Sequence, residues 1–395
     1  MLRNPSERNQ RRNSRIQIQI LTGMKEGWEY KQLGEVCIIR TGKLDVNAQD
    51  PNGKYPFFTC DSKPYLINTY AFDDEAILIS GNGSKVGHIH YYNGKFNAYQ
   101  RTYVLTNFNY LSPQFLSKFL KGYLRSHIYA TKKGGCIPFI TLPLLKNFII
   151  PVPPIEEQKR IVEELDLLSG IIEKQQQQLK ELDTLAQSIF YDMFGDPVTN
   201  EKGLDIQLLK DGVNEMFIGP FGSALKKDCF VSEEEGYCIV YEQKHAIQKK
   251  LEFETRYITK DKYLSLKRFE VGPGDFIMSC RGTVGELFRL PHNAPKGIIH
   301  PSLMKLNIDS NIYNHIFFEW LLSTVIKYEN TKGNCVQMAV TAKELGNKEV
   351  IVPPLSLQNL FASKIEAIEK QKDAITKSIA ETQKLFDYTM DKYFG

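Results

Sequence analysis

Two segments of this chain repeat apolar residues at alternating intervals of four and three, one after Pro153-Pro154 and one after Pro353-Pro354. This spacing places the apolar residues in a narrow stripe along a helix, which fits a partner helix better than the broad face of a domain. Each segment covers about 40 residues, so each helix would be roughly 60 Å long. We therefore predict two long helices that pair with each other through a coiled-coil seam.

The seam has the same phase in both segments. The predicted pairing residues are Ile161, Leu165, Leu168, Ile172, Leu179 and Leu182 in the first helix and Phe361, Ile365, Ile368, Ile375, Ile379 and Phe386 in the second. Gln175 and Lys372 interrupt the apolar pattern, and we interpret them as solvent-facing breaks rather than as a device that sets the register.

The repeat extends over the whole chain. With an offset of 200 residues, Gln158 meets Gln358 and the two Pro-Pro pairs coincide. The segments before each helix also correspond in pattern: residues 33–43 with 209–227, 76–92 with 275–290, and 134–147 with 333–347. They are rich in Tyr, Phe, Ile, Val and turn glycines, which is typical of short strands with some helix. The predicted fold is α+β, with two pseudo-repeated globular domains joined by two long antiparallel coiled-coil helices.

The domain boundaries follow from this plan: residues 1–23 form a basic extension, 24–150 the first globular domain, 151–195 the first spacer helix, 196–350 the second domain and 351–395 the second spacer helix. Because the first helix delivers the chain to the second domain, the second helix has to return antiparallel. This gives an approximate dyad with separated domains. Such symmetry matches duplex DNA that is read at two half-sites.

Charge separates the extension from the rest of the chain. Residues 1–23 contain five arginines and one acid, which is typical of a disordered extension or of a basic arm that touches nucleic acid. The full chain has 50 Lys+Arg and 46 Asp+Glu, so 45 of each remain from Met24 onward. A net charge of zero from Met24 onward argues against a protein that coats DNA without regard to sequence. It fits local basic patches, or phosphate contacts shared with a partner.

Several kinds of site are missing from the sequence. The seven cysteines form no C-x-x-C pair, which indicates reduced thiols in the cytoplasm and no zinc site. No apolar run is long enough to span a bilayer. There is no P-loop, and no Asn or Asp followed by Pro-Pro and an aromatic residue, as an amino-methyltransferase would need. The glycine-rich residues 81–87 lead into a strand-like segment, so we predict a hairpin loop rather than a phosphate cradle.

Three segments together carry a family resemblance: PVPPIEEQKRIVEELD at the start of the first helix, GKLDVNAQDPNGKYPFFTC at 42–60 and MFGDPVTNEKG at 193–203. With the duplicated plan, they resemble the specificity subunit of type I restriction-modification systems, over nearly everything from Met24 to Gly395. The second copy departs from the pattern, because Ser356-Leu357 stands where the first has Glu156-Glu157. The two partner contacts therefore need not be equally strong.

The resemblance implies two target-recognition domains, each reading one half of a split sequence in double-stranded DNA. The helices would set the spacing and hold two modification (methyltransferase) subunits, with or without two restriction (motor-nuclease) subunits. The chain itself would be non-catalytic and would bind no cofactor or metal. S-adenosylmethionine, ATP and Mg²⁺ would belong to the partner subunits, which would act as an adenine-specific DNA methyltransferase and an ATP-dependent endonuclease.

Base edges are read by Arg or Lys at guanine and by Asn or Gln at adenine, from exposed loops. The candidate DNA-binding residues are Lys43, Asn82, Ser84, Lys85, Gln100 and Arg101 in the first domain and Ser223, Lys226, Lys227, Arg281, Thr283 and His300 in the second. We align Gln100 and Arg101 with His300 in the parallel segment. For each residue taken alone, ordinary loop polarity is the competing interpretation.

Two other functions compete with the DNA-reading scaffold. The chain could itself be a methyltransferase or nuclease with an unrecognised site, and the missing cofactor motifs count against that. It could also be an adaptor whose paired helices bind proteins while its globular domains read no DNA.

Overall fold

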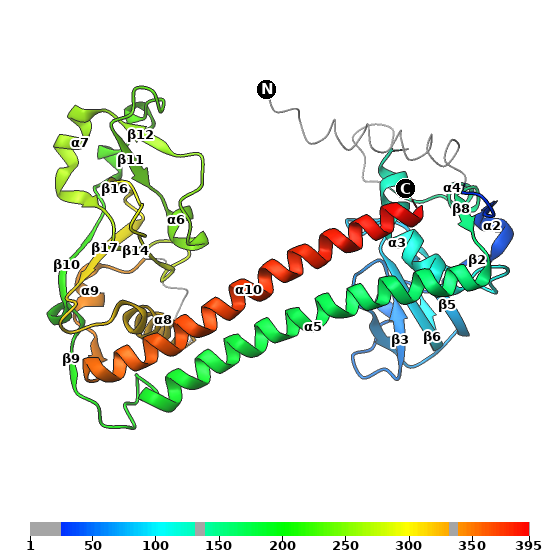
Figure 1. Cartoon of the computed structure of the whole chain (residues 1–395), viewed down its shortest axis with the longest axis horizontal. Helices are drawn as coiled ribbons and strands as arrows, with labels where there is room; N and C mark the ends of the chain where they lie inside the picture. The colour runs from blue at the N-terminus through cyan, green and yellow to red at the C-terminus, as the bar shows by residue number, and fades with distance from the viewer. Residues whose placement is uncertain (1–24, 131–138, 332–338, 395) are drawn as a thin grey trace. The chain divides into compact units, whose positions relative to one another are not determined.

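The computed structural model describes residues 25–130, 139–331 and 339–394 (Figure 1). The predicted basic extension therefore lies outside the described residues. The chain divides into two compact units, Met1–Gln177 with Thr376–Gly395 and Gln178–Ile375. Each unit thus contains part of both long helices. The predicted domain boundaries stay a prediction, because the divisions between the units fall within these helices.

The first unit is built on a curled six-stranded sheet in the order β2-β7-β5-β6-β3-β4. Its strands are β2 (Ile38–Thr41), β3 (Tyr55–Phe58), β4 (Tyr65–Ile67), β5 (Phe72–Ser80), β6 (Ile89–Ala98) and β7 (Thr102–Thr106). The helices are α2 (Leu33–Val36), α3 (Pro113–Ala130) and α4 (Leu142–Lys146), and β1 (Glu29–Gln32) pairs with β8 (Ile149–Val152). Ile77 and Ile79 of β5 pack in one core with α3, and Leu78 packs in a second core with Phe96. Both faces of β5 are buried, which explains its unbroken apolar run.

The second unit has two four-stranded sheets, in the orders β10-β17-β14-β15 and β12-β11-β16-β13. Their strands are β10 (Val213–Ile218), β11 (Cys238–Tyr241), β12 (Arg256–Ile258), β13 (Glu270–Val271), β14 (Phe276–Ser279), β15 (Leu287–Arg289), β16 (Gly297–Ile299) and β17 (Leu303–Ile308). The helices are α6 (Gln243–Gln248), α7 (Lys260–Leu266), α8 (His315–Thr331) and α9 (Ala342–Gly346), and β18 (Glu349–Ile351) pairs with β9 (Ile206–Leu208). Phe276 and Met278 of β14 face the core with α8, and Ile277 faces the other core.

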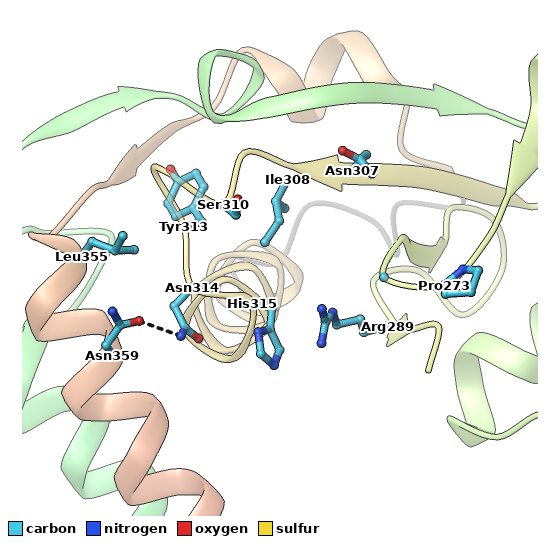
Figure 2. A pocket seen from close by; sticks show the side chains of 11 residues that line it. Pro273, Arg289, Asn307, Ile308, Ser310, Tyr313, Asn314, His315, Leu355 and Asn359 are labelled. Atoms are coloured by element: carbon cyan, nitrogen blue, oxygen red, sulfur yellow. Dashed lines mark hydrogen bonds between the residues drawn. The ribbon is translucent and has the colours of Figure 1, made fainter. Parts of the chain in front are cut away.

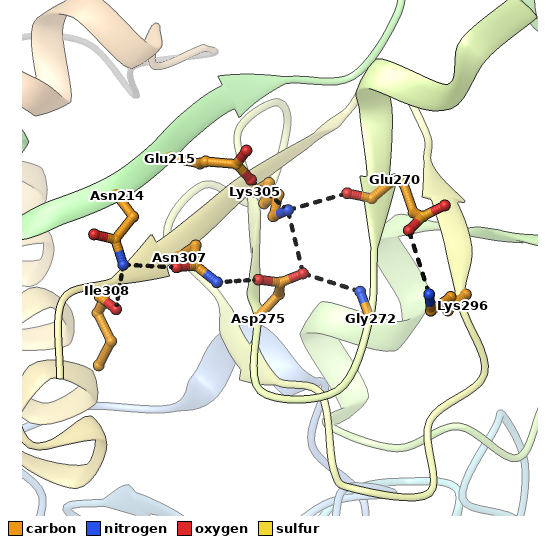
Figure 3. Close-up of polar contacts among 9 residues, drawn as sticks. All are labelled: Asn214, Glu215, Glu270, Gly272, Asp275, Lys296, Lys305, Asn307 and Ile308. Atoms are coloured by element: carbon orange, nitrogen blue, oxygen red, sulfur yellow. Dashed lines mark hydrogen bonds and ion pairs between the residues drawn. The ribbon is translucent and has the colours of Figure 1, made fainter.

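A polar cluster around buried Lys305 and Asp275 links strands of the two sheets of the second unit, since Lys305 also donates to Glu270 O of β13 at 3.2 Å (Figure 3). Lys305 of β17 forms ion pairs with Glu215 at 2.6 Å and Asp275 at 3.3 Å. Asp275 also accepts hydrogen bonds from Asn307 at 2.6 Å and from the backbone N–H of Gly272 at 2.9 Å. Since a buried charge is costly unless it is paired and hydrogen-bonded, this cluster ties the turn before β14 to β17.

The two long helices are α5 (Ile155–Phe194) and α10 (Leu355–Phe394), each of 40 residues. They pack antiparallel (Figure 1), since residue numbers fall along α10 as they rise along α5. In the first unit Tyr393 donates to Glu164 at 2.5 Å, and in the second the rings of Phe194 and Phe361 lie 5.4 Å apart. The α+β class and the antiparallel helix pair predicted from the sequence are confirmed.

The predicted seam lies inward along both helices. Ile161, Leu165, Leu168, Phe361, Ile365 and Ile368 are buried, and Ile172, Leu179, Leu182, Ile375, Ile379 and Phe386 are half-buried. The two polar residues of the seam differ from our interpretation as solvent-facing breaks. Gln175 is half-buried and donates to Ser378 Oγ at 2.7 Å, and Lys372 pairs with Asp183 at 2.8 Å. Both bonds cross between the helices, so these residues contribute to the pairing.

Candidate nucleic-acid interface

Three loops of the first unit meet where strands β2 and β5 end and β7 begins, and we call this side of the sheet its loop edge. The backbone N–H of Gly42, after β2, donates to Thr102 O at 3.2 Å, and Gly81, after β5, donates to Arg101 O at 2.9 Å. Ile140, in the segment before α4, donates to Gly81 O at 2.8 Å. These bonds join segments far apart in sequence into one surface, on which the predicted DNA-binding residues of this domain lie.

A glycine is required where β2 ends. A Cβ atom at Gly42 would lie 1.9 Å from the carbonyl oxygen of Ala98, closer than any side chain could approach. The close contact draws the end of β2 against the end of β6. A bridge between Leu44 and Tyr99 continues the contact, so exposed Lys43 is held beside the loop that carries Gln100 and Arg101.

An open pocket of about 250 Å³ lies at this edge, lined in part by Asn82, Gln100, Arg101 and Phe139. Gln100 and Arg101 are exposed and Asn82 is half-buried. The thiol of Cys60 donates to Asn82 Oδ1 at 3.1 Å and so orients the amide. A guanidinium and two amides around one hollow are the groups that read guanine and adenine.

The glycine-rich segment forms the loop of the antiparallel β5–β6 hairpin, as its sequence predicted. Gly83 and Gly87 adopt φ values of +83° and +78°, which other residues rarely reach. Ser84 and Lys85 lie exposed at the loop tip, while Val86 is buried beneath them. The loop therefore presents its polar side chains outward on a buried support.

The second unit repeats this arrangement bond for bond. Gly219 donates to Leu303 O at 2.9 Å, Cys280 to Ser302 O at 2.9 Å, and Val340 to Cys280 O at 3.0 Å. A Cβ atom at Gly219 would lie 2.4 Å from the carbonyl oxygen of His300. Gly219, Cys280 and Val340 therefore correspond to Gly42, Gly81 and Ile140 of the first unit.

Arg281 and Thr283 lie exposed on the loop after β14, in the place of Asn82 and Ser84. The side chain of Gln243 in α6 supports this loop, because its Nε2 donates to Arg281 O at 2.7 Å and to Thr283 O at 3.4 Å. Sequence reasoning did not select Gln243, since only the folded chain brings α6 beside this loop.

Our alignment of His300 with Gln100 and Arg101 is off by at least one residue. The N–H of Leu303 donates to His300 O at 2.9 Å, and in the first unit Thr102 donates to Tyr99 O at 2.8 Å. His300 therefore corresponds to Tyr99, not to Gln100 or Arg101. Its Nδ1 lies 2.8 Å from Ser302 Oγ. Burial, the largest effect, lowers the pKa of the imidazole, so the ring is neutral at pH 7.

The remaining predicted residues lie on short turns after β10. Ser223 is in the turn Gly222–Ala224 and Lys227 in the turn Lys227–Cys229, with Lys226 immediately before it, and all three are exposed. They follow Gly219, the counterpart of Gly42, so they extend from the same edge as Arg281.

Two exposed aromatic residues flank these edges and were not selected from the sequence. Phe139 is 63% exposed and lines the pocket of the first unit, and Phe221 is 83% exposed two residues after Gly219. No sequence pattern around Phe139 or Phe221 distinguishes these exposed residues from phenylalanines of the core. Exposed rings beside amides and guanidinium groups can stack on bases.

The chain is similar to known DNA specificity proteins. Residues 25–183 match the family model described as Type I restriction modification DNA specificity domain. The EcoDI specificity subunit of Escherichia coli is 27% identical over 89% of this chain and 83% of its own length. The putative MjaX specificity subunit of Methanocaldococcus jannaschii is 24% identical over 89% of this chain and 91% of its own.

Two solved structures share the fold. The S subunit from M. genitalium aligns with a TM-score of 0.56 and 17% identity over 93% of this chain and 96% of its own. A chain from a study of assembly and conformational transition in the type I R-M system aligns with a TM-score of 0.61 and 19% identity, over 94% of this chain and 98% of that chain. In both fold and sequence, the chain is therefore similar to type I specificity subunits. Residues 25–183 match the type I restriction modification DNA specificity domain, and over 89% of its length the chain is similar to a type I restriction enzyme specificity subunit.

Two further observations concern residues 25–130, 139–331 and 339–394. No helix in these ranges has an apolar stretch long enough to cross a bilayer. Within the same ranges, no three His, Cys, Asp or Glu side chains are grouped so that they could hold a metal ion. The buried thiols of Cys37 and Cys280 have pKa values raised by burial to about 12 and about 11, so neither forms a reactive thiolate at pH 7.

Proposed function

We propose that this chain reads a split sequence in double-stranded DNA, with one half read by each unit. The observation that carries this proposal is the repeated loop edge, in which the same backbone hydrogen bonds present Asn82, Gln100 and Arg101 in one unit and Arg281 in the other. Guanidinium and amide groups on exposed loops have the donors and acceptors that distinguish bases in the major groove.

We further propose that the helix pair holds two modification subunits, with or without restriction subunits, and sets the spacing of the two half-sites. The balanced charge of the chain from Met24 onward supports a division of labour, because the partners would supply many of the phosphate contacts. S-adenosylmethionine, ATP and Mg²⁺ would be bound by those partners, and the complex would act in the cytoplasm, where it has access to DNA.

The decisive experiment is to co-express the chain with its neighbouring methyltransferase and to map methylated adenines across the genome. We expect a two-part sequence with a non-specific spacer. Exchange of residues 76–92 for the corresponding loop of a relative should change one half only. A continuous target, or a change in both halves, would contradict independent reading by the two units.

A competing adaptor function makes a different prediction. An adaptor would bind the modification subunits through its helices but would leave the complex without sequence preference. A gel-shift with the partner subunits present, comparing the mapped target with scrambled DNA, separates the two functions.

A further inference from the structure

The second unit has an open pocket at the opposite ends of its strands from the loops that we propose read bases. Its volume is about 370 Å³, and it lies where α8, the first turn of α10 and the ends of β15 and β17 meet. Arg281 follows the end of β14, whereas Gly274 in the pocket lining precedes its start. Figure 2 shows the guanidinium of Arg289 beside the ring of His315, with Asn314 hydrogen-bonded to Asn359 at 2.9 Å.

The equivalent position in the first unit shows which chemical group this pocket can bind. The β5–β6 and β14–β15 hairpins are closed by matching backbone hydrogen bonds, from Ser80 N at 2.9 Å and from Ser279 N at 2.8 Å. This alignment puts Tyr91, opposite Ile77, in the place of Arg289, opposite Phe276. By the same count along the strands, the first unit has Glu75 where the second has Gly274.

In the first unit the side chain of Glu75 occupies the position that corresponds to the pocket. Tyr91 donates its hydroxyl to Glu75 Oε1 at 2.5 Å, and Gln114 Nε2 donates to the same oxygen at 3.1 Å. In the second unit a glycine replaces the carboxylate, and an arginine replaces the tyrosine that bound it. Compared with the first unit, the second unit therefore has one more positive charge, on Arg289, and one fewer negative charge at this position.

Arg289 is poised for an anion. Among the described residues its Nε atom is buried and has no hydrogen-bond partner, which is costly for a charged group. The acid that acts on it most, Glu319, is itself ion-paired with Lys249 at 2.7 Å. The pocket also opens at the first residues of α8 and α10, and the N-termini of helices of 17 and 40 residues favour negative charge.

We propose that this pocket receives the carboxylate of an aspartate or glutamate side chain from a protein partner, one modification subunit of the assembly in the proposed function on which this inference rests. A carboxylate is favoured because the equivalent site already holds one. A protein is favoured over a DNA phosphate because the pocket faces away from the base-reading edge. Leu360, 52% exposed beside Asn359, gives the same partner an apolar contact.

The proposal predicts that the two modification subunits bind unequally, because only the second unit offers the empty site. The test is Arg289→Gln, with Tyr91→Phe at the equivalent position as the matched control. Stepwise binding of modification subunits to the full chain without DNA is measured by mass photometry. We expect Arg289→Gln to weaken one of the two binding steps at least tenfold and Tyr91→Phe to leave both unchanged.

A second measurement needs no partner. Acetate is titrated onto the full chain while the ring of His315 is followed by NMR over a pH series. The charged and titratable groups around this ring are Arg289, His292, Glu319 and Glu366. Bound acetate should raise the pKa of His315 in the wild type and should not do so in Arg289→Gln.

Three outcomes would overturn the inference. Subunit binding could be unchanged while the assembled complex loses DNA affinity, which would make Arg289 a phosphate contact. Both binding steps could be unchanged with DNA affinity intact. If Arg289→Gln does not fold, the acetate titration decides, and an unresponsive His315 in the wild type rejects the site. A wild-type complex that still methylates a split sequence upholds the proposed function in each case.

Discussion

Gln158 accepts a hydrogen bond from the backbone N–H of Ser112 at 2.7 Å, which ties the first turn of α5 to the start of α3. Its amide group donates to the carbonyl oxygens of Tyr110 and Pro153, each at 2.8 Å. Gln358 makes the same three bonds in the second unit, at 2.8, 2.9 and 2.8 Å. One side chain thus fixes the exit angle of each long helix from its domain.

Replacement of Gln158 or Gln358 by Leu should lower the free energy of unfolding by about 2–4 kcal/mol, because buried backbone groups lose their partners. Urea denaturation measures the change, with exposed Gln187→Leu on α5 as the control. A loss below about 0.5 kcal/mol would show that water replaces the side chain and that these glutamines do not hold the helix start.

The double substitution Leu165→Asp and Ile172→Asp should separate the helices and abolish assembly with modification subunits. Leu165 is fully buried in the core with Tyr393, and an unpaired carboxylate there costs several kcal/mol, about 4 or more. Size-exclusion chromatography with light scattering measures assembly.

The matched control for this pair is Leu167→Asp with Ile171→Asp on the same helix. These residues are 65% and 37% exposed, so two charges are added without disturbing the seam. Equal behaviour of the two double mutants would mean that charge on α5, and not helix pairing, governs assembly.

If Arg101 and Arg281 read bases as proposed, removal of either one should act on one half of the target. Arg281→Ala should cost about 1–3 kcal/mol in binding and relax the sequence read by the second unit alone. Arg101→Ala should do the same for the first unit. Methylation mapping reports the half affected. Lys370→Ala, which removes an exposed charge from α10, is the control and should leave both halves unchanged.

Acid should weaken the second unit through His245. This residue is 1% exposed, and its Nδ1 accepts the backbone N–H of Glu242 at 2.9 Å at the start of α6. Burial is the main cause that lowers its pKa, so the folded ring resists a proton that the unfolded chain takes up near pH 6.5. The stability from this group is present above about pH 6.5 and is lost as the pH falls below it.

The free energy of unfolding should therefore decrease between about pH 7.5 and pH 5.5, with a smaller slope in His245→Gln. Urea titrations at a series of pH values measure both slopes. Identical slopes would assign the acid sensitivity to other groups.

Local patterns in the sequence were enough to predict the helix pair and the duplication. The four-three spacing from Ile161 onward specifies one face of a helix whatever surrounds it, and the recurrence of Pro-Pro and of Gln158 at Gln358 marks the second copy. The spacing is readable because it depends on residues within a few positions of one another, and the duplication is readable because the same local pattern occurs twice.

The surface that we propose reads bases could be predicted only in part. Loops with Asn82 and Arg281 were recognisable as polar hairpin loops, but their meeting with Phe139 or Gln243 required strand pairing over long separations. His300 was displaced in our alignment because the segment from Gly285 to His300 is longer than the one from Gly87 to Tyr99, and hydrogen bonds, not residue counts, define equivalent positions.

By itself the sequence determined that this protein has two copies of one plan, joined by two long helices that pair, because hydrophobic periodicity is a property of neighbouring residues. Only the tertiary structure decided that Arg289 and Gly274 stand where Tyr91 and Glu75 stand in the first unit. The physical reason is that a pocket is made by side chains from distant strands and helices, and its charge depends on which of them the fold leaves without a partner.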